Sequence, residues 1–303
     1  NLCSEIVLPT GRDHRGRQRS AVCCLASMNL ATWGEWRERE GLIEDVLRML
    51  DNVLTHFIEK APDRLAQARY AAARERSVGL GVMGFHSALQ AQGIALEEDR
   101  AKAWNREVFR HLRSQADRAS AKLAAERGIS IICGGVSAGV EPFPANIYTH
   151  KTLSGAFSVR NPQLLALLRR KGKDLPEIWQ SILEHQGSVQ HLDCLSPREK
   201  AVFRTAFEVD QYRLLVLGAE RTPFICQSQS LNLFLDSQVD RWDLHMLHWT
   251  AWRSGIKSLY YCRSKAAQRP GFAGLADNSR PSVAGQCRRH GSGEEGGDCE
   301  ACQ

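Results

Sequence analysis

Two apolar segments near the end of the chain, separated by a helical one, constrain the fold more than any other feature. Residues 224–235 and 256–262 are rich in apolar side chains and are predicted to be strands. The residues between them form a predicted helix that Gly255 can end. A helix that joins two strands in this way brings the second strand parallel to the first. This strand–helix–strand unit predicts an α/β protein.

The rest of the chain adds predicted helices and strands. Residues 40–60 carry apolar side chains at intervals of three and four, which predicts a helix that Pro62 ends. A second long helix is predicted over 97–127, which is rich in Ala, Arg, Glu and Lys. Between them, three glycines alternate with apolar residues over 77–84, which indicates a close-packed turn or a strand meeting a helix. Further strands are predicted at 6–8, 21–25 and 129–133, and further helices at 64–76, 164–170 and 177–185.

Two stretches are predicted to lack regular structure. Residues 136–162 contain prolines, glycines and polar residues and are too long for a simple connection, which is typical of a functional loop. After residue 270 the apolar content falls, and Gly, Ser, Arg and Glu dominate to the end. We therefore expect one domain over 1–270 and a flexible, disordered tail over 271–303.

The composition disfavours two kinds of partner. Although 43% of the 303 residues are hydrophobic, no apolar run approaches the ~20 residues of a membrane helix. The net charge of +6 suits an anionic ligand such as a nucleotide, but the basic residues form no long run, so we expect no nucleic-acid binding. No secretory signal pattern is present, so we expect a cytoplasmic protein whose ten cysteines are thiols. Because the chain begins with Asn1 rather than Met, we also expect that residues precede it.

Cysteines at the two ends of the chain indicate thiol redox chemistry. Cys299 and Cys302 form a Cys-x-x-Cys pair behind a glycine-rich segment, and such a pair can exchange disulfides on a flexible arm. Three interpretations remain open: a redox shuttle, half of a zinc site completed by Cys287 and His290, or exposed thiols without a function. The sequence favours the shuttle.

Two further pairs of residues have both a chemical and a structural interpretation. Cys3 and Glu5 would leave the same face of a strand, either as a radical or redox centre with its general base or as part of an ordinary edge strand. Their spacing alone favours the ordinary strand. Tyr260 and Tyr261 are adjacent, so they are either one core and one surface residue or two stacked phenols that relay an electron and a proton.

Six motifs and the closing Cys-x-x-Cys, all in the same order, resemble the large (alpha) subunit of class I ribonucleotide reductases. Any one of them would be weak evidence, but the combination runs over nearly the whole chain and is specific. Two of the motifs are similar to a bacterial branch of that family, those at 141–155 and 223–233. The motifs are NLCSEI at 1–6, AVCCLASMNL at 21–30, RSVGLGVMG at 76–84, EPFPANIYTHKTLSG at 141–155, PFICQSQSLNL at 223–233 and SLYY at 258–261.

The resemblance implies a fold and a radical centre. The fold would be the second half of a ten-stranded α/β barrel with a central finger loop that carries the radical cysteine, here Cys3. Its thiyl radical would remove the 3′ hydrogen of the ribose, Glu5 would take the 3′-hydroxyl proton, and Asn1 would hold the sugar hydroxyls. The activity implied is the reduction of ribonucleotides to 2′-deoxyribonucleotides.

The resemblance also implies how electrons reach the centre. Cys23 would be one member of the dithiol that supplies reducing equivalents, and Cys299 and Cys302 would re-reduce it. Tyr260 and Tyr261 match the pair that hands the radical to the finger loop. A thioredoxin or glutaredoxin would in turn reduce the tail.

The implied cofactors lie outside this chain. The radical would come from a metal cofactor in a separate small (beta) subunit, and nucleotide effectors (ATP or dNTP) would bind the N-terminal part of the family's chain. We expect no metal in this chain. The one candidate set of metal ligands lies on a predicted helix whose apolar residues form a packing face, so packing explains this helix better than a metal site does. That set is Asp243, His245 and His248.

Two departures from the family count against independent activity. The family's chain extends well upstream of the motif at 1–6, and that part supplies the first half of the barrel, so a complementing N-terminal half or a second alpha chain is expected as a partner. The family also has a longer segment before 129–132, with a turn that binds substrate phosphate, and this segment is shortened here. We therefore expect the isolated chain to be inactive. The alternative is a truncated paralogue that binds reductase subunits without chemistry.

Overall fold

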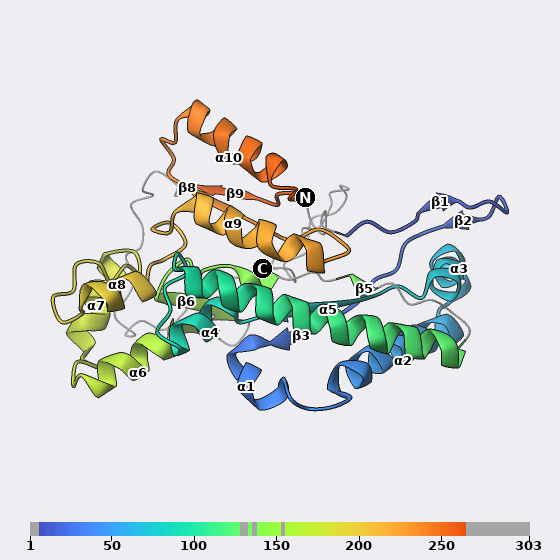
Figure 1. Ribbon diagram of the computed structural model, residues 1–303, viewed down its shortest axis with the longest axis horizontal. Coiled ribbons are helices and arrows are strands. Elements are labelled where there is room, and N and C mark those ends of the chain that lie inside the picture. The colour runs from blue at the N-terminus through green and yellow to red at the C-terminus, as the bar shows by residue number, and fades with distance from the viewer. Residues whose placement is uncertain (1–5, 128–132, 135–137, 153–154, 265–303) are drawn as a thin grey trace, which may run out of the picture. The chain divides into compact units, whose positions relative to one another are not determined.

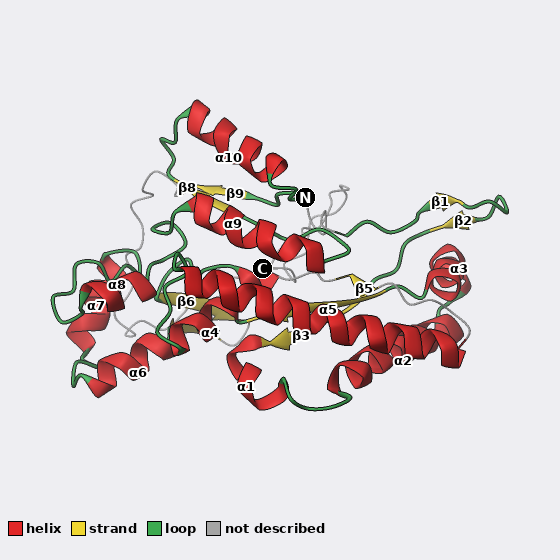
Figure 2. Cartoon of the chain, in the orientation of Figure 1, coloured by secondary structure: helices red, strands yellow, loops and turns green. Residues whose placement is uncertain are grey.

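The computed structural model describes residues 6–127, 133–134, 138–152 and 155–264. All of them belong to one compact unit of the chain, Asn1–Lys265. Helices and strands are both present, as predicted, and Figure 2 shows how the helices surround the strands. Within these residues no helix is both long and apolar enough to span a membrane. The predicted domain boundary at residue 270 and the tail that follows lie outside the described residues.

A parallel sheet of three strands forms the centre of the fold. Its order is β3 (Cys24–Asn29), β4 (Val78–Met83) and β5 (Cys133–Gly134). β3 and β4 pair along their whole length, from Cys24 opposite Val78 to Asn29 opposite Met83. All residues of β4 except the last are buried, as expected for the middle strand of a parallel sheet.

The glycine-rich segment is a strand meeting a helix, as the sequence predicted. β4 ends at Met83, and α4 (Phe85–Ala91) begins two residues later. Gly84 joins them in the left-handed region, with φ of 76°, and a Cβ there would lie 2.8 Å from Oδ1 of Asn29. A side chain at this position would therefore disturb the end of β3.

Three helices pack along the central sheet and carry most of the core (Figure 1). They are α2 (Leu42–Lys60), α5 (Asp99–Arg127) and α9 (Gln211–Arg221), and α5 contacts both of the others. The prediction of helices over 40–60 and 97–127 is confirmed. The buried stripe of α2 contains Ile43, Leu47, Leu50 and Leu54, whereas Val53 is exposed.

The strand–helix–strand unit is present near the end of the described chain. β8 (Leu233–Leu235) and β9 (Cys262–Ser264) pair in parallel, and α10 (Arg241–Arg253) lies between them in the sequence. The predicted strand over 224–235 was too long, and the one predicted over 256–262 shares only Cys262 with β9. Residues 222–224 form a short 3-10 helix, η4, and the ladder begins only at Leu233 and Cys262.

A second helical region has its own apolar core. It consists of α6 (Pro162–Arg170), α7 (Pro176–Glu184) and α8 (Pro197–Val202), which surround buried residues such as Leu168, Trp179 and Ile182. Two of these helices confirm the predictions at 164–170 and 177–185. The stretch 136–162 was wrongly predicted to be irregular, because it contains the antiparallel hairpin of β6 (Ile147–Thr152) and β7 (Gly155–Arg160) and a short 3-10 helix, η3 (Ala138–Val140).

The beginning of the described chain differs from the prediction. Residues 6–8 are not a strand, and the strand predicted at 21–25 begins at Cys24. The residues between these two segments hold a small hairpin of β1 (Gly11–Arg12) and β2 (Gln18–Arg19), which lies against α3 (Ala66–Glu75). The side chain of Asp13 organises its turn, because Oδ1 accepts from N of Arg15 and of Arg17, and Oδ2 accepts from the Tyr70 hydroxyl at 2.6 Å. The remaining short elements are η1 (Leu30–Thr32), α1 (Trp33–Trp36) and η2 (Asp63–Leu65).

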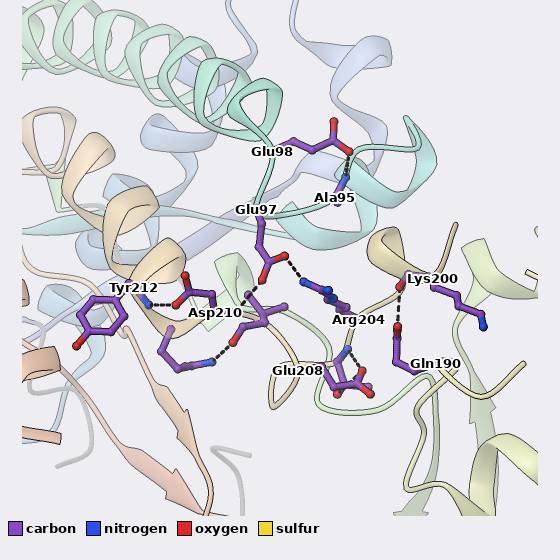
Figure 3. Close-up of polar contacts among 12 residues, drawn as sticks. Ala95, Glu97, Glu98, Gln190, Lys200, Arg204, Glu208, Asp210 and Tyr212 are labelled. Carbon is purple, nitrogen blue, oxygen red and sulfur yellow. Dashed lines mark hydrogen bonds and ion pairs between the residues drawn. The ribbon is translucent and has the colours of Figure 1, made fainter. Parts of the chain in front are cut away.

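One carboxylate ties the start of α5 to the start of α9 (Figure 3). Glu97 accepts hydrogen bonds from the Arg204 guanidinium and, at 2.8 Å, from N of Asp210. Asp210 in turn caps α9 by accepting from N of Tyr212 at 2.9 Å. This chain of contacts fixes the relative register of two helices that are more than 80 residues apart in the sequence.

A buried ion pair fixes the entry to β4. Arg76 adopts a left-handed conformation, with φ of 44°, between α3 and β4. Its Nε donates to Oδ1 of Asp51 at 2.6 Å, and its Nη2 donates to the Asp51 carbonyl oxygen and to the Thr55 hydroxyl. Asp51 is fully buried on α2, so this pair joins α2 directly to the first residues of the central strand.

We predict that Arg76→Met lowers the free energy of unfolding by about 3–5 kcal/mol, because it leaves the buried Asp51 carboxylate without its counter-charge. Urea unfolding followed by tryptophan fluorescence measures the change. Arg113→Met is the matched control: it breaks an exposed pair with Asp117 and should cost no more than about 1 kcal/mol. Equal losses for the two variants would contradict this role of Arg76.

Candidate functional site

The structure describes three of the residues to which the sequence assigned chemistry. These are Cys23, Tyr260 and Tyr261. The other candidate residues, Asn1, Cys3, Glu5, Cys299 and Cys302, lie outside the described residues. The proposed roles of that second group, and the zinc alternative involving Cys287 and His290, therefore stay predictions.

Cys23 lies immediately before β3, where the chain enters the central sheet. Its side chain is exposed, whereas that of the next residue, Cys24, is half-buried. Burial raises the pKa of the Cys24 thiol, so less of it is thiolate at a given pH. Of these two adjacent thiols, Cys23 is the one that an incoming disulfide or dithiol can reach.

Tyr260 and Tyr261 form a ring pair directly before β9. Their ring centroids are 4.3 Å apart, and the rings meet edge to face at 69°. Both side chains are half-buried, so the interpretation of one core and one surface tyrosine does not hold. The contact is the one that a relay between neighbouring phenols requires.

Segment 231–233 holds the backbone of the tyrosine pair. N of Tyr260 donates to the Leu231 carbonyl oxygen, and N of Leu233 donates to the Tyr261 carbonyl oxygen, each at 2.9 Å. N of Tyr261 donates to Oδ1 of Asn232, also at 2.9 Å. Every one of these contacts comes from a segment that lies about 30 residues earlier in the chain.

One charged side chain contacts a ring of the pair, and a carboxylate lies near Asn232. The guanidinium of Arg263 lies over the Tyr261 ring, 5.5 Å from its centroid. Burial raises the pKa of Glu141, and its hydrogen bonds with Asn232 and the charges of Arg263 and Arg221 oppose that shift. Sequence reasoning assigned no role to Glu141 or Asn232, although both lie within motifs that resemble the family, at 141–155 and 223–233.

Arg221 is a nearly fully buried cation on α9. Its Nε donates to Oε1 of Gln229 at 2.6 Å, and its Nη1 donates to Oδ1 of Asn105 at 3.1 Å. Burial lowers its pKa to about 9, against the opposing charge of Glu141. It also lines a cavity of about 50 Å³ between α5, β4 and the segment after η4. Such a cavity is far smaller than the ~300–1,000 Å³ of small-molecule sites, so it does not hold a nucleotide.

No group of three or more His, Cys, Asp or Glu side chains in the part of the chain that the structure describes is arranged to hold a metal ion. Asp243, His245 and His248, the candidate ligands from the sequence, lie on α10 and are among the residues that the structure describes. His248 Nδ1 contacts the Leu244 carbonyl oxygen at 2.8 Å, which is a contact within the helix.

The comparison with family models defines the class of protein. The model described as "Ribonucleotide reductase, barrel domain" matches residues 1–130 and 127–262. The match includes the exposed Cys23, the tyrosine pair and every described strand up to the first residue of β9. The chain therefore belongs to the family of ribonucleotide reductase large subunits, in the region of the barrel domain.

Individual relatives agree with this assignment. The chain is 43% identical over 290 residues to the ribonucleoside-diphosphate reductase large subunit of Invertebrate iridescent virus 6, covering 87% of this chain and 30% of that protein. It is 40% identical over 291 residues to the protein of the same name in Invertebrate iridescent virus 3, covering 88% of this chain and 45% of that protein.

A solved structure shares the fold. The class Id ribonucleotide reductase alpha subunit of Actinobacillus ureae superposes with a TM-score of 0.77 at 37% identity, covering 88% of this chain and 53% of that one. The chain thus spans less than two thirds of the length of each of these three proteins. Its fold is the barrel-domain fold of the alpha subunit, over the part of that domain that the match covers.

We predict that a maleimide modifies Cys23 at least about tenfold faster than Cys24 at neutral pH, because the exposed thiol is accessible and burial keeps more of the Cys24 thiol protonated. The Cys24 rate should rise steeply at alkaline pH, as its raised pKa is approached. Mass spectrometry of the labelled peptides measures both rates, with the urea-unfolded chain as control, where the two rates should converge. Faster labelling of Cys24 in the folded chain would contradict the arrangement.

Proposed function

We propose that this chain carries the catalytic half of a ribonucleoside-diphosphate reductase large subunit, which reduces ribonucleoside diphosphates to 2′-deoxyribonucleoside diphosphates by a thiyl radical. The observation that carries the proposal is the ring contact of Tyr260 and Tyr261, at 4.3 Å, in a chain whose family is established. Two touching phenols suit a relay of an electron and a proton.

The radical centre is assigned to the motif at 1–6. Cys3 would hold the thiyl radical and remove the 3′ hydrogen atom of the ribose. Glu5 would take the proton from the 3′ hydroxyl, and Asn1 would hold the sugar hydroxyls. Water then leaves C2′, and two electrons from a dithiol complete the reduction.

The dithiol chemistry is assigned to three cysteines. Cys23 would be one member of the pair that becomes oxidised, and its exposure at the entry to β3 supports this role. Cys299 and Cys302 would attack the resulting disulfide and leave both active-site thiols reduced. A thioredoxin or glutaredoxin would then reduce the Cys-x-x-Cys pair.

The remaining parts of the enzyme would lie outside this chain. The radical would be imported from a metal cofactor in a small (beta) subunit, and ATP or dNTP effectors would bind the N-terminal part of the large subunit. That part, or a second alpha chain, would also complete the ten-stranded barrel. The exposure of Leu25 (47%) and Met83 (50%) on strands of the central sheet supports this, because a closed barrel would cover them.

One observation favours the second candidate, a truncated paralogue that binds reductase subunits without catalysis. The family model matches in two pieces that meet at residues 127–130, where the sequence predicts that a phosphate-binding segment is shortened. A nucleoside diphosphate carries its charge on the phosphates, so loss of their donors would weaken substrate binding.

We predict that the chain forms deoxycytidine diphosphate from cytidine diphosphate only when an N-terminal half of a family large subunit is supplied together with beta subunit and dithiothreitol. The physical reason is that the described central sheet has three strands, too few to close a barrel by itself. Product formation measured by chromatography tests this. Cys3→Ser should abolish turnover under the complemented condition.

Two results would change the assignment. Turnover by the chain with beta subunit and reductant alone would contradict the need for a complementing half. A folded complex of all components without any product would contradict catalysis and support the binding-only paralogue. Cys194→Ser is the control, since Cys194 is half-buried against the helical core of α6–α8 and should not affect turnover.

A further inference from the structure

The contact between Tyr260 and Tyr261 is unexpected for adjacent residues in an extended segment. Side chains of neighbouring strand residues point to opposite faces, which separates them. The two rings nevertheless meet at 4.3 Å. The backbone must therefore depart from a regular strand here, so that one of the two side chains turns toward the other.

The hydrogen bonds across segment 231–233 supply the cause. In a regular parallel ladder, one residue opposite Asn232 would provide both the N–H to Leu231 and the carbonyl oxygen to Leu233. Here Tyr260 provides the N–H and Tyr261 provides the carbonyl oxygen. Two residues thus face one, which is the definition of a β-bulge. The bulge explains why both rings reach the same side.

A bulge leaves one backbone N–H outside the ladder, and here it belongs to Tyr261. This N–H donates to the side chain of Asn232, at 2.9 Å from Oδ1. Asn232 is 4% exposed, so water does not compete for this contact. Asn232, which faces the bulge, therefore also binds the backbone N–H of Tyr261 that the bulge leaves outside the ladder.

Asn232 is held in turn by Glu141. The carboxylate accepts from N of Asn232 at 3.3 Å, and it also hydrogen-bonds the Asn232 side chain. Because Oδ1 of Asn232 receives the Tyr261 N–H, its NH2 group is the donor that remains for the carboxylate. Glu141 thereby fixes the orientation of the amide that holds Tyr261.

We infer that Asn232 and Glu141 are positioning residues for the tyrosine relay: they stabilise a β-bulge that brings the rings of Tyr260 and Tyr261 into contact. Neither residue touches the phenol groups in the contacts above, so they act through the backbone. The inference deepens the proposed function and rests on it, since the relay gives the ring contact its purpose. The geometry of the clamp itself can be tested in the isolated chain.

The test uses 3-fluorotyrosine in place of all five tyrosines of the full chain. Fluorine resonances are assigned with single Tyr→Phe variants, and the nuclear Overhauser cross-peak between Tyr260 and Tyr261 reports the ring contact. The cross-peak should be present in the unaltered chain and lost in Asn232→Ala and Glu141→Ala. It should be retained in Glu141→Gln, whose side-chain carbonyl oxygen keeps an acceptor for Asn232.

Asn146→Ala is the matched control. Asn146 is 1% exposed and donates to the carbonyl oxygens of Gly187 and Phe203, away from the tyrosine pair. The cross-peak between Tyr260 and Tyr261 should persist in Asn146→Ala. The Tyr212 resonance should stay unchanged in every variant, as a check of folding. Loss of the cross-peak in Asn146→Ala as well, or its persistence in Asn232→Ala and Glu141→Ala, would overturn the inference. Absence of the cross-peak in the unaltered chain would instead remove the ring contact on which the proposed function depends.

Discussion

The buried pair of Asp51 and Arg76 is the interaction on which the central sheet depends. It joins α2 to Arg76, two residues before β4, and β4 is the middle strand that both β3 and β5 need as a partner. The pair is costly to bury and is satisfied by three hydrogen bonds from one guanidinium. Because β3 takes its register from β4, the same pair indirectly places Cys23, which precedes β3 by one residue.

The tyrosine pair depends on a different kind of constraint. It is set by hydrogen bonds between the segments that lead into β8 and β9, and not by apolar packing alone. The side-chain amide of Asn232 and the partly buried carboxylate of Glu141, which directly follows η3, complete this set of hydrogen bonds. The two candidate regions thus rest on separate parts of the fold, one on the sheet β3–β4–β5 and the other on the pair β8–β9.

The sequence predicted the features that depend on local periodicity. The helices over 42–60 and 99–127 were found within two residues, because their composition and spacing repeat over many turns. The two-residue strands at Gly11 and Gln18 were missed, since the side chain of Asp13 organises that turn and no periodicity marks it. Tyr260 and Tyr261 were found by resemblance, whereas Glu141 was not, because it reaches Asn232 across 91 residues of sequence. A contact of that range leaves no local pattern.

The central claim is that Tyr260 and Tyr261 conduct a radical toward Cys3. The most direct measurement replaces Tyr261 with 3-aminotyrosine, whose phenol is easier to oxidise, in the complex with beta subunit and a complementing N-terminal half. Electron paramagnetic resonance after addition of cytidine diphosphate should show an aminotyrosyl radical, and the matching replacement of Tyr212, exposed on α9, should show none. Deoxycytidine diphosphate formed by the unaltered complex, with no aminotyrosyl radical trapped at position 261, would contradict the account.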